Sequence, residues 1–323
     1  MFLLSIVLPI NYQISSVANI IDVFEEANHI QSKRGESDLF KIQLIQAESL
    51  AEGEKSQFQD YKIKTTRGKD TPNLLLIPAI KRRGLKENYK LNGKLVKWIQ
   101  EQYKNGAEVA SLCTGAYIFA ETGILNAKIA TTHVDFCSHF ILTYPLIYTK
   151  PGRTLTVDWN CYTSGGSTSS FHLLIYLIQK FYGNEIAVKV SKTFAIELDR
   201  YHQSYFSTFR PIYSHNDDLV TEIQKQLESN YTRISTIDEV TREFPASRRN
   251  LVRRFIKATG IPPIQYLQNV RIEKAKQLLE NSDLSVTEVI GETGYTDPKS
   301  FRKVFLKLVG ITPLAYREKF RVA

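Results

Sequence analysis

Two groups of side chains in the last quarter of the chain have the types and spacing that contact with DNA requires. Arginine and lysine bind guanine O6 and N7 or phosphate oxygens, and asparagine matches the donor and acceptor edge of adenine. Residues 244–272 and 298–317 contain basic residues but no Asp or Glu, so each stretch creates a positive field that suits phosphates. The candidate DNA-contacting residues are Arg248, Arg249, Asn250 and Arg253 in the first group, and Lys299, Ser300, Arg302 and Lys303 in the second.

A third group of residues, near the middle of the chain, has the pattern of a small-molecule site. Cys113 lies between a predicted strand and a predicted helix, with the small residues Ser111 and Gly115 on either side of it. Small flanking residues permit a tight, strained turn like a nucleophile elbow, and the following helix start would lower the pKa of the thiol. We expect Cys113, Thr114 and His133 to line a ligand pocket. The alternative is that Cys113 is simply a small buried residue at a turn.

The DNA-contacting candidates lie on a segment that the chain contains twice. Residues 247–267 align without a gap with residues 297–317. Such a repeat indicates one structural unit used twice. The residues that the two copies share are Phe255/Phe305, Lys257/Lys307, Gly260/Gly310, Ile261/Ile311, Pro263/Pro313 and Tyr266/Tyr316.

Each copy has the start and stop signals of a helix. Ser247 and Asp297 are favoured N-cap residues, and a glycine followed by a proline ends each helix. The apolar residues between these signals recur at helical spacing, and a short amphipathic helix is predicted before each copy, at about 236–243 and about 286–292. A helix, a short turn and a capped basic helix form the helix-turn-helix pattern. Residues expected in its core are Leu251, Phe255, Phe301 and Phe305.

The predicted helix between the copies, at about 264–280, sets their spacing. At about 1.5 Å per residue it spans about 25 Å, which permits two contacts about 34 Å apart, in successive major grooves. The copies differ where bases would be read, so we expect a bipartite, non-repeating DNA site. Two alternatives are that only one unit contacts bases, or that both are amphipathic hairpins with solvated basic faces.

Residues 231–320 resemble the AraC-type transcription-factor domain. The matching stretches are SRRNLVRRFIKATGIPPIQYL, NVRIEKAKQLL and SVTEVIGETGYTDPKSFRKVFLKLVGITPLAYR. The resemblance implies sequence-specific binding of double-stranded DNA by two helix-turn-helix units. Thr241 and Gly291 occupy positions where that family usually has alanine. Both residues are small, although glycine lowers helix propensity.

The first 190 residues alternate between short apolar runs and helical patterns, which is typical of a parallel sheet covered on both faces. Strands are predicted at 3–10, 40–46, 73–78, 107–112 and 154–163, and helices at 16–30, 92–105, 116–122 and 169–182. The predicted fold class is an α/β N-terminal domain, flavodoxin-like, followed by an all-α C-terminal domain with two helix-turn-helix units. The expected boundaries are 1–195 for a sensor domain, 196–216 for a surface-hugging linker and 217–323 for the DNA-binding domain.

The N-terminal domain resembles the DJ-1/PfpI superfamily, of the class I glutamine amidotransferase-like fold. The resemblance rests on GAEVASLCTGAYIFAETGILNAKIATTH and on the glycine-rich YTSGG. Its combination with an AraC-type domain resembles the GlxA-like subfamily of transcriptional regulators. Active members of the superfamily often place a histidine directly after the cysteine and a glutamate near the first helix, whereas this chain has Thr114 and residues 15–18 read SSVA. We therefore expect a ligand-controlled regulator that is not an enzyme and holds no cofactor. The alternative is a cysteine-dependent hydrolase or amidotransferase-like enzyme with an accessory DNA-binding domain.

Composition agrees with this interpretation. The chain has 323 residues, enough for two domains, and a net charge of +9 that suits a nucleic-acid partner. Its first ten residues, MFLLSIVLPI, favour a buried strand over a signal peptide or a membrane span. The three cysteines match no zinc or disulfide pattern, so we expect reduced thiols and a cytoplasmic location without membrane contact. Further expected partners are a small-molecule effector and a second copy of the chain.

Overall fold

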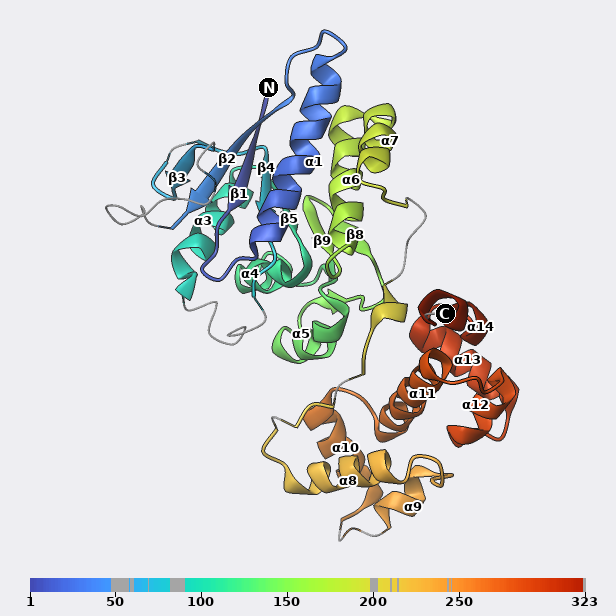
Figure 1. Ribbon diagram of the computed structural model, residues 1–323. Helices are drawn as coiled ribbons and strands as arrows, with labels where there is room; N and C mark the ends of the chain where they lie inside the picture. The colour runs from blue at the N-terminus through green and yellow to red at the C-terminus, as the bar shows by residue number, and fades with distance from the viewer. Residues whose placement is uncertain are drawn as a thin grey trace. The chain divides into compact units, whose positions relative to one another are not determined.

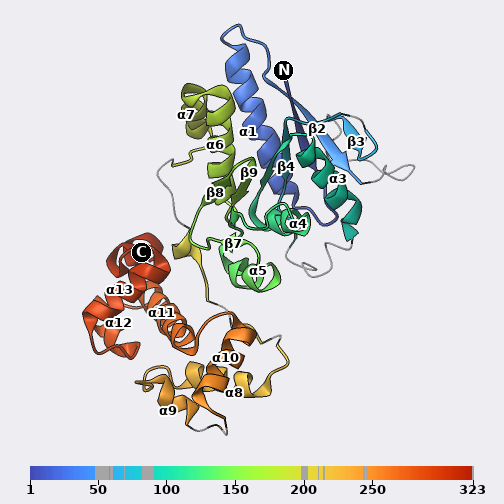
Figure 2. The ribbon, with the colours of Figure 1, turned by 180° about the vertical axis from the view of Figure 1, so that it is seen from behind.

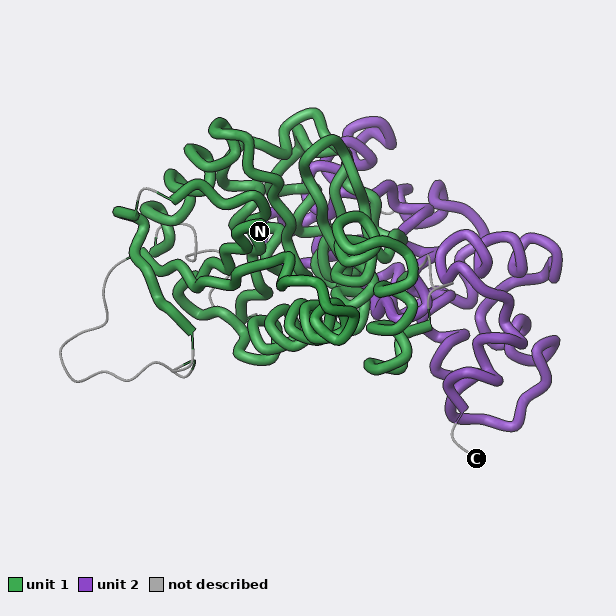
Figure 3. Tube along the Cα trace, turned by 90° about the horizontal axis from the view of Figure 1, so that it is seen from above, with its two compact units in different colours: residues 1–203 green, residues 204–323 purple. Residues whose placement is uncertain are grey.

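The computed structural model describes residues 1–47, 58, 61–68, 70–81, 91–197, 203–209, 211–213, 215–242, 244 and 246–321. The chain forms two compact units, Met1–Gln203 and Ser204–Ala323, which are coloured separately in Figure 3. Parts of the predicted linker, at 198–202, 210 and 214, lie outside the described residues, as does position 243 of a predicted helix. Among the described residues, no helix has the length and apolar character needed to cross a membrane.

The first unit is built on a seven-stranded sheet with the order β3-β2-β1-β4-β5-β9-β8 (Figure 1). Every neighbouring pair is parallel except β8 and β9, so the predicted mostly parallel sheet is confirmed. Strands β6 (Ile129–Ala130) and β7 (Tyr148–Thr149) form a small separate pair. The strands of the main sheet are β1 (Phe2–Val7), β2 (Phe40–Gln46), β3 (Ile63–Thr65), β4 (Leu74–Ile77), β5 (Glu108–Ser111), β8 (Leu155–Asp158) and β9 (Cys161–Ser164).

Helices cover both faces of this sheet, as Figures 1 and 2 show. Successive residues of a strand point to opposite faces, so the apolar run of β4 serves two cores. Leu74 and Leu76 belong to the core beneath the first helix group, whereas Leu75 and Ile77 belong to the core on the other face. The first group is α1 (Ile14–Ser32), α6 (Ser169–Tyr182) and α7 (Asn184–Thr193), and the second is α3 (Gly93–Lys104), α4 (Ala116–Glu121) and α5 (Cys137–Thr143).

One strand prediction was wrong. Residues 154–163 do not form a single strand, because the chain reverses at Trp159 and Asn160 to make the antiparallel pair β8 and β9. Trp159 has a positive φ of 53° and its side chain is 85% exposed. Tight hairpin turns usually announce themselves by Asn-Gly or Asp-Gly, and Trp-Asn carries no such signal. The first strand also ends at Val7, before the predicted Ile10.

The second unit is all α-helical over its described residues, apart from one short 3-10 turn at Ser204–Phe206, and contains the predicted pair of helix-turn-helix units. Helices α9 and α10 form the first, α12 and α13 the second, and α11 runs between them (Figure 1). Each has its own apolar core, and α11 contributes to both. The predicted core residues Leu251, Phe255, Phe301 and Phe305 are all fully buried. The helices are α8 (Asp218–Ser229), α9 (Ile237–Thr241), α10 (Arg248–Thr259), α11 (Pro263–Asn281), α12 (Val286–Glu292), α13 (Pro298–Val309) and α14 (Pro313–Phe320).

Candidate nucleic-acid interface and strained cysteine turn

The two basic helices, α10 and α13, begin and end where the sequence predicts. The Ser247 hydroxyl accepts a hydrogen bond from the Asn250 backbone N–H at 3.4 Å, and the Asp297 carboxylate accepts from two backbone N–H groups at 3.0 Å. Gly260 and Gly310 close the helices with left-handed φ values of 79° and 86°. An L side chain disfavours this conformation, which explains the glycine in both copies.

Each basic helix buries one face and exposes the other. Apart from Arg248, the exposed basic residues have no ion-pair partner among the residues that the structure describes, so their charges are available to a ligand. Because the buried side of each helix is anchored by fully buried apolar side chains, the charged side faces solvent as a fixed surface. The exposed basic residues are Arg249, Arg253 and Lys257 on α10, and Lys299, Arg302, Lys303 and Lys307 on α13.

Three of the predicted DNA-contacting residues also make contacts inside the protein. Arg248 forms an exposed ion pair with Asp238 at 2.8 Å, and the Ser300 hydroxyl donates to the Asp297 carboxylate at 2.8 Å. Asn250 is half-buried. An exposed ion pair is worth about 0–1 kcal/mol, so Arg248 can exchange Asp238 for a phosphate at little cost.

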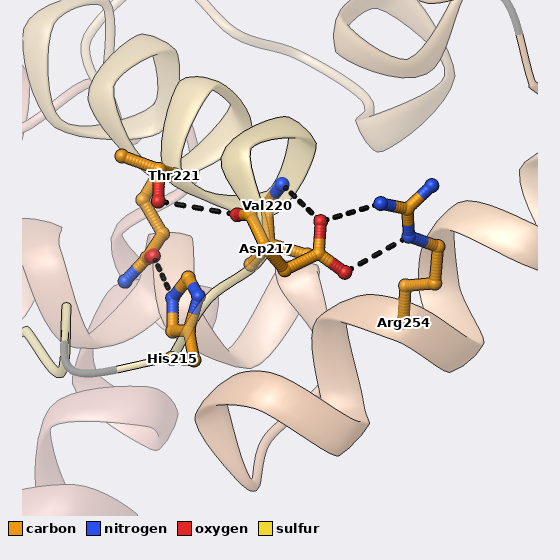
Figure 4. A network of polar contacts seen from close by, with 6 residues as sticks. His215, Asp217, Val220, Thr221 and Arg254 are labelled. Carbon is orange, nitrogen blue, oxygen red and sulfur yellow. Dashed lines mark hydrogen bonds and ion pairs between the residues drawn. The ribbon is translucent and has the colours of Figure 1, made fainter.

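Arg254 is a basic residue of α10 whose guanidinium is bound within the protein (Figure 4). Its Nε and Nη2 bind the two carboxylate oxygens of Asp217 at 2.9 and 2.6 Å, and Asp217 also caps α8 by accepting from the Val220 N–H at 3.2 Å. The hydrogen bonds from Arg254 are the main cause that lowers the pKa of Asp217 below its usual value. This contact holds α10 on α8. The equivalent position in α13 is Val304, which is half-buried and packs against the apolar core.

A basic pocket of about 570 Å³ lies beside α10. Arg253 and Lys257 line one side of it, and His215 and Asn216, which precede α8, line another. The His215 ring Nε2 lies 2.7 Å from the Gln224 Oε1, which fixes the ring (Figure 4). Asp217 also lines the pocket but is paired with Arg254, whereas Arg253 and Lys257 have no ion-pair partner in the described part of the chain. These two cations at a concave site favour an anion such as a backbone phosphate.

The two helix-turn-helix units are held in a fixed relation within the second unit. The Arg271 guanidinium donates to the backbone oxygens of Tyr231 and Ile234 at 2.8 Å and lies 5.2 Å from the centre of the Tyr295 ring. Gly294 has a φ of +77°, and a Cβ there would lie 2.6 Å from the Thr232 Cα. The turn between α12 and α13 therefore touches the loop between α8 and α9 backbone to backbone, which restrains the separation of α10 and α13.

One duplicated contact, between a tyrosine and a glutamate, was not predicted from the sequence. The Tyr266 hydroxyl donates to Glu228, and the Tyr316 hydroxyl donates to Glu280. Burial, and then the neighbouring carboxylate, raise the pKa of both tyrosines, so both remain donors at all physiological pH values. The shared tyrosine thus ties the helix after each basic helix to the helix that precedes each helix-turn-helix, α11 to α8 and α14 to α11.

In the N-terminal unit, Met1–Gln203, the strained turn around Cys113 is present. Cys113 has a φ of +54° and is 5% exposed, and its backbone N–H donates to the Ser164 hydroxyl at 3.3 Å. A Cβ on Gly115 would lie 2.5 Å from the Pro78 oxygen, so only glycine lets α4 approach β4 this closely. The turn stands at the carboxyl end of β5, the edge at which parallel sheets bind ligands.

Thr114 and His133 are both close to this turn but have different environments. The Thr114 hydroxyl donates to the Ile80 oxygen at 2.7 Å and accepts from the Ile80 N–H at 3.0 Å, and the residue is 1% exposed. That hydroxyl is therefore fully used by the backbone. His133 is half-buried, and its Nδ1 accepts from the Asp135 N–H at 3.2 Å, which leaves the proton on Nε2. The Thr132 hydroxyl, next to His133, donates to the Cys113 oxygen at 2.9 Å.

Two family models match the chain. A model described as "Helix-turn-helix domain" matches residues 240–319, and a model described as "DJ-1/PfpI family" matches residues 41–180. The first match contains both basic helices, and the second contains the Cys113 turn.

Curated relatives carry regulator names. The chain is 26% identical over 224 residues to the HTH-type transcriptional regulator GbdR of Pseudomonas aeruginosa, covering 69% of this chain and 61% of that protein. It is 27% identical over 220 residues to the HTH-type transcriptional regulator CdhR of the same species, covering 68% and 65%. It is 23% identical over 217 residues to the HTH-type transcriptional regulator GlxA of Rhizobium meliloti, covering 66% of each. All three alignments span less than two thirds of those relatives' length.

A crystal structure of a Vibrio parahaemolyticus protein has a similar fold. It superposes with a TM-score of 0.50 and 19% identity, covering 59% of this chain and 98% of that one. At this identity the likeness concerns the fold alone.

Proposed function

Because the chain joins a DJ-1/PfpI domain to an AraC-type helix-turn-helix domain, we propose that it is a sequence-specific DNA-binding transcriptional regulator. The observation that carries the proposal is the pair of capped basic helices whose exposed cations lack ion-pair partners among the described residues. Their fixed relation through α11 and the Gly294 contact supports binding to one continuous stretch of duplex. The names of the curated relatives agree with this role.

In the proposed mechanism, α10 and α13 enter successive major grooves on one face of the DNA. Arg249 and Arg253 of α10 and Lys299 of α13 are exposed near the helix starts, where side chains reach base edges. Arg302 and Lys303 complete the second reading surface. Lys257, which lines the basic pocket beside Arg253, binds a backbone phosphate, and this contact positions the protein without reading sequence.

Arg248, Asn250 and Ser300 have supporting roles in this proposal. Arg248 leaves Asp238 and pairs with a phosphate, because DNA offers a denser negative charge than one exposed carboxylate. The Ser300 hydroxyl donates to Asp297, so toward DNA it acts as an acceptor. The Asn250 Oδ1 is buried without a hydrogen-bond partner among the described residues, so Asn250 reads an adenine edge after its side chain rotates outward.

The N-terminal domain acts as a non-catalytic effector sensor in this proposal. Cys113 and His133 border the effector site, and Thr114 shapes it through its two hydrogen bonds to Ile80. A catalytic thiol needs a base within reach and a partner for that base. The position after the cysteine is instead occupied by a threonine whose hydroxyl is bound to backbone. We further propose a homodimer located in the cytoplasm, where the three free thiols Cys113, Cys137 and Cys161 stay reduced.

The proposal is tested by selecting fragments of the host's genomic DNA with the purified full chain at physiological salt. We expect enrichment of sites with two dissimilar halves, about one helical turn apart. An Arg249→Ala/Arg253→Ala variant should lose the enrichment, whereas Lys189→Ala, an exposed lysine of the first unit, should retain it. Equal enrichment by both variants would contradict the assignment of α10.

A further inference from the structure

Gln203, the last residue of the first unit, has its side chain buried inside that unit. It is 1% exposed, and its Oε1 accepts from the Gly166 N–H at 3.0 Å. Its Nε2 donates to the backbone oxygens of Thr132 at 3.0 Å and Pro151 at 2.9 Å, and to the Thr131 hydroxyl at 3.3 Å. The amide orientation is fixed, since an N–H can only donate and a carbonyl can only accept.

The surrounding loop leaves room for this carboxamide. A Cβ on Gly165 would lie 2.0 Å from the Gln203 Oε1 and 2.4 Å from its Cδ. A Cβ on Gly166 would lie 2.4 Å from the His133 Cδ2. Any side chain at these glycines would therefore close the space that the Gln203 amide and the His133 ring now fill.

The carboxamide site is joined to the strained cysteine turn by two short connections. Thr132 accepts from Gln203 with its backbone oxygen while its hydroxyl donates to the Cys113 oxygen. Ser164 accepts from the Cys113 N–H and directly precedes Gly165. The amide of Gln203 therefore lies next to the residues that the proposed function assigns to the effector.

The residues that follow Gln203 are packed into the second unit. Tyr205 is 9% exposed and belongs to the core formed by α11, α13 and α14. The Lys276 ammonium donates to the Ser207 oxygen, and the Phe209 N–H donates to the Glu273 carboxylate at 3.1 Å. A single residue, Ser204, thus separates the buried amide of the sensor from a core side chain of the DNA-binding unit.

We propose that the Gln203 side chain is a tethered occupant of a carboxamide-binding site in the sensor domain. An effector that carries a primary carboxamide displaces this side chain and thereby releases the connector, residues 203–209, from the sensor domain. The site presents one N–H donor opposite several acceptors. A carboxylate would lack protons for the Thr132 and Pro151 oxygens, and an ammonium or guanidinium would lack an acceptor for the Gly166 N–H. A primary carboxamide satisfies both sides, and it leaves no buried donor or acceptor at the cost of an unmade hydrogen bond. The regulatory half of the inference rests on the proposed function.

The test uses the full chain with Gln203→Ala, which removes the equivalent of one acetamide molecule. The thermal unfolding temperature should fall, and millimolar acetamide should restore part of the loss, whereas acetate and N,N-dimethylacetamide should not. Gln43→Ala is the matched control, because Gln43 is 3% exposed in the same unit and its amide donates to Ser5 at 2.8 Å. Rescue of neither variant, or of both alike, would overturn the carboxamide site.

If Gln203→Ala does not fold, Gln203→Glu provides the same information. Its ionised carboxylate would face the Thr132 and Pro151 oxygens, whereas the protonated acid retains one donor. The unfolding temperature of Gln203→Glu relative to the unsubstituted chain should therefore fall as pH rises through the carboxyl titration. A pH-independent difference would overturn the proposed contacts.

The regulatory half is measured separately with a selected DNA fragment. Gln203→Ala should change the apparent DNA affinity several-fold without any ligand, and acetamide should leave that change in place, because a free amide fills the site without holding the chain that follows residue 203. Unchanged affinity, with acetamide rescue of stability intact, would overturn the release of the connector. The stability measurement contains no DNA, so failure of the proposed DNA-binding function would leave the carboxamide result interpretable.

Discussion

The two helix-turn-helix units have the same scaffold and different contact surfaces. Both use a buried phenylalanine, Phe255 or Phe305, and both end the basic helix at a left-handed glycine. They differ at the helix start, where Arg248-Arg249-Asn250 stands against Pro298-Lys299-Ser300. They also differ in support, because α10 is held to α8 by an ion pair whereas α13 has Val304 at that position. The repeated residues hold each unit together, and the divergent ones would determine what each unit reads.

The largest expected effect separates the two reading surfaces. Arg249→Ala/Arg253→Ala should weaken binding to the half-site that α10 contacts, and Lys299→Ala/Lys303→Ala should weaken binding to the half-site that α13 contacts. If each of the two lost base contacts costs about 1–3 kcal/mol, either double variant loses about 2–6 kcal/mol of binding free energy, which lowers affinity for the full site by roughly 30-fold at the least. Competition gel shifts with one half-site scrambled at a time measure this. Loss of both half-sites from one double variant would show that the units do not read independently.

A smaller effect concerns the contact between Gly294, in the turn between α12 and α13, and the backbone of Thr232. Gly294→Ala should destabilise the second unit by roughly 2–4 kcal/mol, since it combines a strained φ with a Cβ against the Thr232 backbone. Denaturant unfolding followed by circular dichroism measures the change. In the folded fraction, binding to the full site should suffer more than binding to an isolated half-site. Equal losses would mean that this contact does not set the spacing of the units.

Sequence patterns predicted the elements within each unit well and the contacts between distant residues poorly. Caps, stop glycines and apolar spacing are local signals, so α10 and α13 were placed correctly. From the sequence, Arg254 could not be distinguished from the other basic residues of α10, because its partner Asp217 is far away in sequence. Thr114 was expected to line a pocket, but its hydroxyl is bound by Ile80 on another loop. The burial of Gln203 had no sequence signal, since it depends on three separate loops.

The ion pair between Arg254 and Asp217 supports α10 and has no counterpart among the described residues of α13, so its removal should affect only the first helix-turn-helix. Asp217→Asn keeps a cap acceptor for α8 but loses the charge that Arg254 contacts. After allowance for solvent screening of this partly exposed pair, the expected loss of stability is about 0.5–1 kcal/mol. Asp218→Asn, an exposed neighbour, is the control and should change little. Identical losses in both variants would show that the Arg254 contact contributes nothing measurable.

The caps predict a difference in acid sensitivity. Hydrogen bonds from Ser300 and the Lys299 backbone lower the pKa of Asp297, whereas the Ser247 cap of α10 does not titrate. A folded-state pKa below the unfolded value stabilises the fold above about pH 4, and this contribution is lost as pH falls through the folded value. Asp297→Ser should therefore flatten the decline of the unfolding temperature in acid. An unaltered pH profile would contradict the role of the carboxylate.

The smallest expected effect is a gain. Gly291 lies in α12, and an added Cβ would meet nothing within 4 Å. Gly291→Ala should stabilise the second unit by roughly 0.5–1 kcal/mol through helix propensity. The matched change in α9, Thr241→Ala, removes a hydroxyl bonded to the Asp238 oxygen and should gain less. Denaturant midpoints decide the order, and a larger gain at Thr241 would contradict it.

The most direct test of the central claim is a hydroxyl-radical footprint of the full chain on a selected DNA fragment, with and without the α10 and α13 double variants. The account predicts two protected patches on one face of the duplex, about one helical turn apart. Arg249→Ala/Arg253→Ala should remove one patch, and Lys299→Ala/Lys303→Ala the other. A single patch, or protection that both variants reduce uniformly, would contradict the claim that the chain carries two reading helices of different specificity.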